Sequence, residues 1–206
     1  MNLRLFYSPG ACSLVAHIAL EESGAGFEAV PVPIADGAHH QPEYLAVNPR
    51  GLIPALEVDG EVVTENVAIL ALIGRTFPEA ELFPPDDLGF ARVLERIGFF
   101  ATSVHVGAFR PLFIARRAGR SWSQAEEDAL LGYFREMESL LEPGPWLLCD
   151  SYSAADGYPL TFRRWGWRLG FDMAIYPRWT EHTAAMLGRP AVLRALDREG
   201  LAASEF

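Results

Sequence analysis

The chain has 206 residues, half of them hydrophobic and 21% charged, and carries a formal net charge of −10 at neutral pH. This length allows one substantial core or two small packed domains. An acidic chain without a basic run is a poor match for nucleic acid or for an anionic membrane surface. The two cysteines, Cys12 and Cys149, form neither a Cys-x-x-Cys pair nor a zinc-like spacing, so we expect a reducing cytoplasm and no disulfide scaffold.

The chain opens with an alternating apolar run, residues 3–7, that predicts a strand. Pro9 and Gly10 end it and also argue against a signal peptide, and no later stretch is expected to span a membrane. A helix is predicted from Ser13 to Glu22, with Cys12 at or just before its first turn. Backbone N–H groups and the helix dipole at that place favour a thiolate. The alternative is a small buried cysteine that packs under a turn.

Residues up to 75 continue a mixed strand and helix pattern. Residues 27–34 are β-like, although two prolines push the end of the strand towards a sheet edge. The turn Asp59-Gly60 separates two β-like runs and is typical of a tight hairpin. The later elements are expected as a short helix at 43–47, hairpin strands at 55–58 and 61–64, and a helix at 66–75. A right-handed crossover then gives a four-stranded mixed sheet with three helices.

A proline-rich and acidic stretch, residues 78–89, is predicted to be a linker between domain 1–77 and domain 90–206. No alternating strand pattern follows it, so the second domain is predicted to be all-helical. Its helices are expected at 90–117, 123–141, 153–169, 178–187 and 191–199. Ser123 and Ser153 open capping-box signatures, and Pro159 is expected to cost its helix a hydrogen bond or to bend it.

Three segments of the first domain carry groups that suit one ligand. A proline directly ahead of a strand often marks a cis turn, so Ile53, before Pro54, can offer its backbone N–H and C=O to an extended peptide. Glu65 supplies a carboxylate for an ammonium group, and Asn66, at a helix N-terminus, can receive a carboxylate. With the thiol at Cys12, a ligand that has an amino-acid head, an amide backbone and a thiol fits all three segments. Glutathione is such a ligand.

In four segments the chain resembles the cytosolic glutathione transferases, nearest to the bacterial beta-type group. The segments are Tyr-Ser-Pro-Gly-Ala-Cys-Ser at 7–13, Asn-Pro-Arg-Gly-Leu-Ile-Pro-Ala-Leu at 48–56, Thr-Glu-Asn-Val-Ala-Ile at 64–69 and Ser-Ala-Ala-Asp at 153–156. Each is weak alone, and their order and spacing together are specific. The resemblance implies a thioredoxin-like first domain, a helical second domain that forms the hydrophobic co-substrate site, and an enzyme that transfers glutathione to a hydrophobic electrophile.

The resemblance also implies roles for single residues. In that family the cysteine at the position of Cys12 contacts the glutathione sulfur and can form a mixed disulfide with it. The position of Ile53 pairs with the cysteinyl backbone, and the positions of Glu65 and Asn66 hold the γ-glutamyl end. His105 matches a histidine that reaches towards the thiol site, where it is a candidate acid, base or hydrogen-bond donor. Glutathione is then the co-substrate, no metal is expected, and a homodimer is implied.

The sequence departs from the beta-type pattern at Leu52, Gly98, Val106 and the loop 36–40, which reads Asp-Gly-Ala-His-His. Because Val15 stands where a second cysteine would complete Cys-x-x-Cys, Cys12 cannot run an internal dithiol cycle. Two other functions remain open on the sequence. One is a thiol-transferase or peroxide reductase that works through a Cys12–glutathione mixed disulfide, and the other is a non-catalytic protein that binds a hydrophobic ligand.

Several further residues are weighed against structural roles. Tyr7 and Ser13 are secondary candidates to donate a hydrogen bond to the sulfur, although Tyr7 is more simply a residue that caps a strand end. His105 is divided evenly between an active-site wall and a packing histidine. His17 is expected to be buried structure. The loop pattern His39-His40-x-x-Glu43 lacks further ligands and does not favour a metal site.

Overall fold

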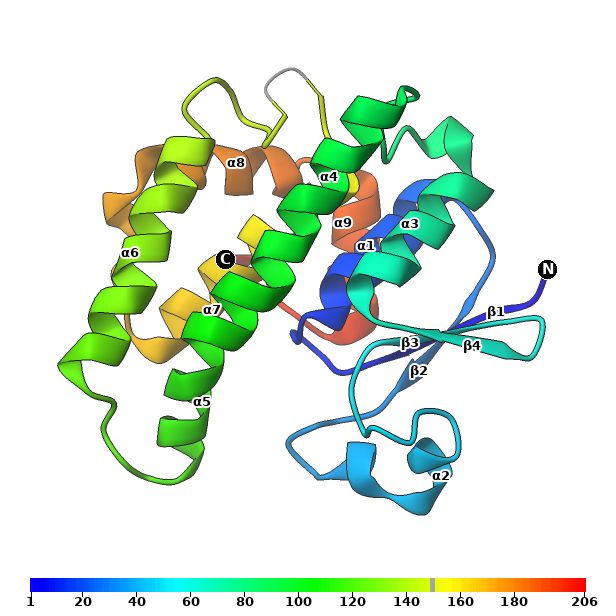
Figure 1. Ribbon diagram of the computed structural model, residues 1–206, viewed down its shortest axis with the longest axis horizontal. Helices are drawn as coiled ribbons and strands as arrows, with labels where there is room; N and C mark the ends of the chain where they lie inside the picture. The colour runs from blue at the N-terminus through cyan, green and yellow to red at the C-terminus, as the bar shows by residue number, and fades with distance from the viewer. Residues whose placement is uncertain (149–150) are drawn as a thin grey trace.

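A computed structural model describes residues 1–148 and 151–206 of the chain, and Cys149, for which no role was predicted, lies outside the described residues. Figure 1 shows a sheet at one side of the molecule and a group of helices at the other. The N-terminal strand starts at the sheet side, and the C-terminus lies among the helices. The two regions are the ones that the sequence predicted, an α/β region followed by a helical one.

The sheet has four strands in the order β2-β1-β3-β4. β1 (Leu3–Tyr7) pairs in parallel with β2 (Glu28–Pro31) and antiparallel with β3 (Ala55–Val58), which forms a hairpin with β4 (Glu61–Thr64). The mixed four-stranded sheet is therefore confirmed. β2 ends at Pro31, earlier than the sequence predicted, because a proline has no N–H to continue a ladder.

Helices α1 (Ser13–Ser23) and α3 (Asn66–Thr76) lie together on one face of this sheet, and the short α2 (Pro42–Leu45) lies beyond the other face (Figure 1). α1 begins directly after Cys12 and ends at Gly24, which takes φ 67° in the left-handed region that a helix C-terminus favours. The predicted place of Cys12 at the N-terminus of α1 is thus confirmed.

The second region is helical in its described part. Its α-helices are α4 (Asp87–Phe99), α5 (Arg110–Arg117), α6 (Gln124–Leu140), α7 (Gly157–Leu169), α8 (Pro177–Leu187) and α9 (Pro190–Glu199). α4 starts three residues before the predicted helix start at residue 90, because the Asp86 side chain accepts the Gly89 N–H and so caps the helix. The predicted capping box at Ser123 and Glu126 opens α6.

A π-helical segment, η3 (Phe100–Phe109), joins α4 to α5. The joined helix, 87–117, is 31 residues long, and by length and composition it is apolar enough to cross a membrane. The prediction that no stretch meets that criterion was wrong, because the helix predicted at 90–117 is continuous through the π segment and begins three residues earlier, at Asp87. Phe100, Val104 and Phe109 are nonetheless buried in the hydrophobic core, and the core helix of a soluble protein passes the same test.

The capping box at Ser153 is confirmed, since Asp156 accepts the Ser153 N–H at 2.9 Å and the hydroxyl at 3.0 Å. The effect predicted for Pro159 is wrong. α7 begins at Gly157, so Pro159 falls in its first turn, where backbone N–H groups have no intrahelical acceptor to lose.

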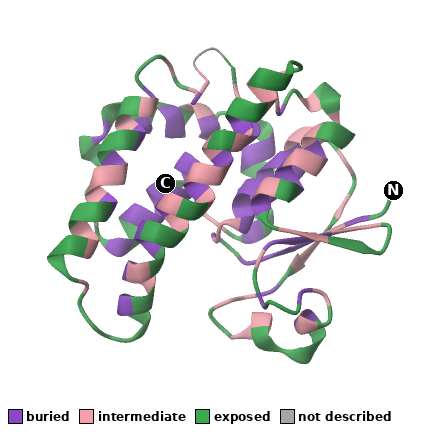
Figure 2. Ribbon diagram, in the orientation of Figure 1, coloured by how far each residue is buried: buried purple, intermediate pink, exposed green. Residues whose placement is uncertain are grey.

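Helix α1 is the element that joins the two regions. Every residue from Ser13 to Glu21 is buried, and Figure 2 shows this helix as buried along most of its length. The sheet covers it on one side, and α7 and α9 pack against it on another. Because the turn that carries Cys12 leads into α1, residues of the second region reach this turn directly.

Candidate active site

A cavity of about 720 Å³ lies between the two regions. Its wall on the side of the sheet includes the turn before α1, the Ile53-Pro54 segment and the residues that lead into α3. Its other wall is formed by η3, α5 and α7. The sequence-predicted residues that line it are Cys12, Ile53, Pro54, Glu65, Asn66 and His105. Six of the seven predicted site residues thus share one cavity.

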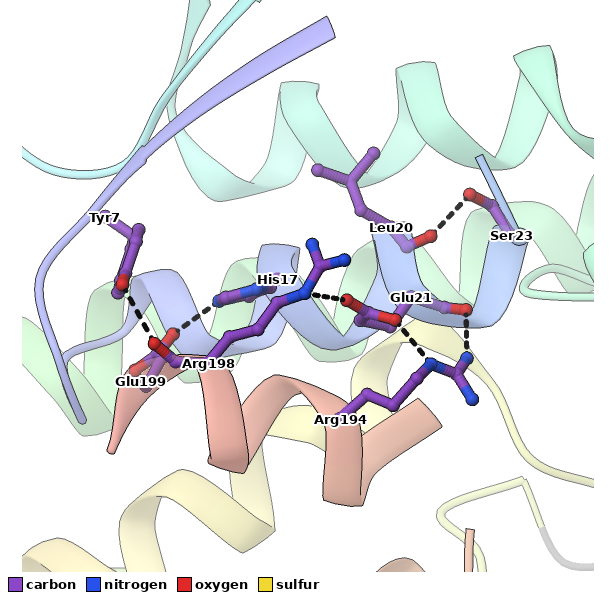
Figure 3. Close-up of polar contacts among 8 residues, drawn as sticks. All are labelled: Tyr7, His17, Leu20, Glu21, Ser23, Arg194, Arg198 and Glu199. Atoms are coloured by element: carbon purple, nitrogen blue, oxygen red, sulfur yellow. Dashed lines mark hydrogen bonds and ion pairs between the residues drawn. The ribbon is translucent and has the colours of Figure 1, made fainter. Parts of the chain in front are cut away.

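Tyr7 is the exception. It is buried, it does not line the cavity, and its hydroxyl donates to the backbone carbonyl of Arg198 at 3.2 Å (Figure 3). Burial is the main cause that raises its pKa, with the Glu199 carboxylate second. The prediction that Tyr7 belongs to the glutathione site is therefore not supported by its position, because its hydroxyl is directed to α9.

Cys12 lies at the cavity wall and is partly exposed, and its thiol donates to the Ile53 carbonyl at 3.5 Å. The sequence predicted a thiol poised towards thiolate. Instead, removal of the sulfur from water raises the pKa of Cys12 to about 12, and the Glu65 and Glu199 carboxylates add to the rise. Hydrogen bonding to the Cys12 and Ser13 N–H groups opposes this but is outweighed. Cys12 is a protonated thiol at neutral pH.

In the turn before Cys12, side chains of the second region bind both backbone polar groups of Gly10. Glu199 of α9 accepts the Gly10 N–H at 2.7 Å, and Trp165 of α7 donates its indole N–H to the Gly10 carbonyl at 2.8 Å. The second carboxylate oxygen of Glu199 contacts Nδ1 of His17 at 2.8 Å (Figure 3). Gly10 itself has φ 66°, and a side chain there would collide with the Arg164 guanidinium. The position of the Cys12 turn therefore depends on α7 and α9.

His17 is buried, as predicted, and its partner is Glu199. Ser13 is buried as well. Its hydroxyl donates to the Ser8 carbonyl and accepts the Ser8 N–H, both at 3.1 Å. Ser13 thus closes the same turn from inside, and its hydroxyl is not directed at the cavity as the alternative role required.

The bond between Ile53 and Pro54 is cis, as the sequence predicted. Asn48 and Tyr44 both donate to the Leu52 carbonyl, at 2.7 and 2.6 Å, and fix the segment that leads to Ile53. Ile53 is partly exposed at the cavity wall. An extended ligand can therefore lie alongside its backbone.

Glu65 and Asn66 stand at the N-terminus of α3. Glu65 has φ 70°, an uncommon conformation for a residue with a side chain, and its exposed carboxylate lines the cavity. Asn66 is buried, and its amide nitrogen donates to the Cys12 carbonyl at 2.9 Å and to the Tyr158 hydroxyl at 3.2 Å. Its Oδ1 has no partner within the described residues. The amide nitrogen of Asn66 thus already donates to Cys12 and Tyr158, and the backbone N–H groups of the first turn of α3 remain available to bind an anion.

His105 lies in η3 and its ring stands 4.8 Å from that of Trp165. Burial, and second the Arg110 charge, together lower the pKa of His105 to about 4. At neutral pH its ring is therefore uncharged and offers one N–H donor and one acceptor. The sequence left open whether His105 lines the active site or is a packing histidine. In the structure it both lines the cavity and packs against Trp165.

Sequence reasoning missed Tyr158, Glu199 and the arginines of the far wall. Tyr158 is buried, lines the cavity, and its pKa is raised first by burial and then by the neighbouring Cys12 thiol. The helix predicted at 153–169 contains Tyr158, but the sequence does not indicate that Cys12 is its neighbour. Glu199 is separated from His17 by 182 positions, so no local pattern joins them.

The first part of the chain, residues 1–75, matches the model of the glutathione S-transferase N-terminal domain. Glutathione S-transferase GstA of Escherichia coli O157:H7 is 34% identical to the chain and aligns with 97% of it and with the whole of GstA. The chain belongs to the glutathione S-transferase family. It is an enzyme of that family, a transferase with glutathione as co-substrate.

Solved structures support this membership. The bacterial glutathione S-transferase BphK, solved as a ternary complex, superposes with a TM-score of 0.86 at 35% identity. The alignment covers 96% of this chain and 100% of BphK. A sphingomonad glutathione S-transferase complexed with glutathione has a TM-score of 0.83 at 37% identity and covers 97% and 100%. The first region of this glutathione transferase is accordingly thioredoxin-like, and the resemblance read from four short segments is confirmed.

Three of the four departures from the beta-type pattern line the same cavity, whereas Gly98, in α4, is not among its lining residues. Leu52 and Val106 both line it and are about half exposed, at 53% and 47%. His39 also lines it, and its pKa is lowered by burial, by His40 and by Arg117. Within residues 1–148 and 151–206 no three histidine, cysteine or acidic side chains are grouped as for a metal ion. The loop 36–40 therefore offers the neutral imidazole of His39 to the cavity, and the charge of Arg117, in α5, acts on that ring.

Proposed function

We propose that this glutathione transferase conjugates glutathione to a hydrophobic electrophile in the cavity between the two regions. The observation that carries the proposal is the convergence of Cys12, Ile53, Glu65, Asn66 and His105 on one cavity of about 720 Å³. These residues come from four separate segments. Their groups match a thiol, a peptide backbone, an ammonium and a carboxylate.

In this proposal the glutathione sulfur lies beside Cys12 and its cysteinyl backbone lies along Ile53. The γ-glutamyl ammonium pairs with Glu65, and its carboxylate meets the N–H groups at the start of α3. The glycyl end then extends towards the loop of His39, where Arg117 is the available cation.

The reaction needs a glutathione thiolate, and the site favours one by donating hydrogen bonds to it. Cys12, with a pKa of about 12, keeps its proton, and its S–H can turn from the Ile53 carbonyl to donate to the glutathione sulfur. The N-terminus of α1 adds its positive dipole end. The thiolate attacks the electrophilic carbon, the new C–S bond forms as the leaving group departs with the electron pair of its bond, and the thiol proton goes to solvent. Neutral His105 is placed to donate to the developing negative charge on the electrophile.

The protonated state of Cys12 favours conjugation over the thiol-transferase alternative. Attack on a glutathione disulfide requires the Cys12 thiolate. At pH 7 a thiol with a pKa of about 12 supplies only a minute thiolate fraction. We further infer a homodimer in the cytoplasm, the usual state and place of the family.

Calorimetric titration with reduced glutathione tests the glutathione site. Because the Glu65 carboxylate faces the cavity without an ion-pair partner among the described residues, Glu65→Gln is expected to weaken binding about tenfold. Glu61→Gln, an exposed carboxylate on the same hairpin outside the cavity, is the matched control and should bind as the wild type does. Equal affinity in all three proteins would contradict the placement of the γ-glutamyl group.

A further inference from the structure

The cavity wall is rich in arginine although the chain is acidic. Of the 17 basic residues in a chain of net charge −10, five line this cavity. They are Arg110, Arg116, Arg117, Arg164 and Arg168. Among the described lining residues Glu65 is the one carboxylate, and it lies at the end of the cavity assigned to glutathione. The sign of charge in the rest of the cavity is thus opposite to that of the whole protein.

Some of these arginines already have partners. Arg164 is buried and pairs with Glu205 at 2.7 Å, and Arg116 donates to the Arg168 carbonyl. Arg117 faces the loop of His39, where the glycyl carboxylate of glutathione is expected. Arg110 and Arg168 are exposed, and their guanidinium groups have no hydrogen bond within the described parts of the chain. The charge of Arg168 also acts on the Glu205 carboxylate, but the guanidinium donors of both residues remain for a second ligand.

Arg110 is placed by the π-helical geometry of η3. Its backbone N–H bonds to the His105 carbonyl five residues earlier, so Arg110 follows His105 on the same side of the helix. The charge of Arg110 also reaches the His105 ring, whose pKa it helps to lower. Arg168 stands one turn after Trp165 on α7, and Trp165 contacts the same ring. Two arginines from different helices therefore flank the His105–Trp165 pair.

Apolar side chains complete this part of the cavity. Phe113, whose ring lies 5.3 Å from that of Trp165, and Ile114 line it beside Trp165. The site thus combines an aromatic and aliphatic surface with two unpartnered guanidinium groups. A guanidinium binds a carboxylate through two parallel hydrogen bonds and remains charged at any physiological pH.

We propose that the electrophile taken by this enzyme carries a carboxylate, which Arg110 binds with the help of Arg168 while its apolar body lies against Trp165 and Phe113. This rests on the proposed conjugation and names its substrate class. The two carboxylates of glutathione do not account for these arginines, because the γ-glutamyl group is assigned to α3 and the glycyl group to the loop of His39.

Equilibrium binding to protein saturated with S-methylglutathione tests the proposal without turnover. The non-reactive probes are 3,5-dinitrobenzoate and its neutral methyl ester, titrated by calorimetry against the full chain. We expect the anion to bind about tenfold more tightly than the ester. Arg110→Gln and Arg168→Gln should each weaken binding of the anion by about that factor and leave the affinity for the ester unchanged. The preference should also shrink as salt is raised, since both arginines are exposed.

Arg92→Gln is the control, because Arg92 is an exposed residue of α4 outside the cavity that pairs with Glu95. It should leave both affinities unchanged. If the ester binds as tightly as the anion, or if the cavity variants weaken both probes equally, a carboxylate is not recognised and this proposal is overturned while conjugation stands. If S-methylglutathione itself does not bind, the proposed function fails first, and this inference fails with it.

Discussion

Removal of the Glu199 side chain should destabilise the protein strongly, because this buried carboxylate has two buried partners. It accepts the Gly10 N–H at 2.7 Å, and it contacts His17 Nδ1 at 2.8 Å (Figure 3). The side chains of Glu199 and His17 are both fully buried. In Glu199→Ala each donor loses its acceptor, at about 1–3 kcal/mol apiece. We therefore expect unfolding to become easier by about 4 kcal/mol, and the melting temperature to fall by about 10 °C.

The matched control is Glu95→Ala, which removes an equivalent carboxylate from an exposed pair with Arg92. Such a pair contributes less than about 1 kcal/mol. Urea unfolding and thermal melting of the three proteins measure the difference. Glu199→Ala and His17→Ala should also be strongly non-additive in a double-mutant cycle. A loss in Glu199→Ala as small as that in the control would refute the reasoning that this contact holds the turn before Cys12.

Three further predictions concern the cavity. The rate of Cys12 alkylation by iodoacetamide should rise about tenfold per pH unit from pH 6 to 9 without a plateau, since its pKa is about 12 and the thiolate fraction keeps growing over that range; peptide mapping by mass spectrometry assigns the rate, and a plateau near pH 8 would contradict it. Tyr158→Phe should lower the free energy of unfolding by about 1 kcal/mol, because the Asn66 amide loses one acceptor but keeps the Cys12 carbonyl; urea unfolding measures this, and no change would contradict the hydrogen bond. The pKa of His105 is lowered to about 4 in the folded protein, so the unfolded chain binds more protons between pH 4 and 6.5 and stability should fall as pH falls through that window; His105→Gln should flatten this part of the unfolding profile, and an unchanged slope would show that His105 is not the group responsible.

Local patterns were sufficient for the architecture. Alternation in residues 3–7, the Asp59-Gly60 turn and the capping residues Ser123 and Ser153 each act over a few positions, and the structure confirms all four. Failures arose where a longer-range effect competes. The helix N-terminus favoured a thiolate at Cys12, with a small buried cysteine as the alternative, and burial dominates the pKa of its thiol. No local pattern reports how deeply a side chain is covered by a distant helix.

The same reason explains which site residues were missed. The residues proposed to contact glutathione lie in short segments with recognisable sequence motifs, so the sequence alone was enough to propose them. Glu199, Trp165 and Tyr158 lie on helices whose sequence is merely amphipathic, and their importance follows from contacts to Gly10 and Asn66 far away in the chain. The position of Arg110 depends on a π-helical turn, which places residues five apart on one side of the helix. Sequence patterns for α-helices assume spacings of three and four residues, so they do not pair Arg110 with His105.

The contacts to Gly10 have a consequence for how the two regions work together. Its N–H is bound by α9 and its carbonyl by α7, while Cys12, two residues later, begins the helix that both of these elements cover. α7 also carries Trp165, which contacts His105, and Arg168 in the co-substrate wall. One helix thus fixes the proposed glutathione side and the proposed electrophile side of the cavity relative to each other. A substitution that moves α7 should therefore alter glutathione affinity and electrophile preference together, whereas substitution of Arg110 or Phe113 on α5 should alter electrophile preference alone.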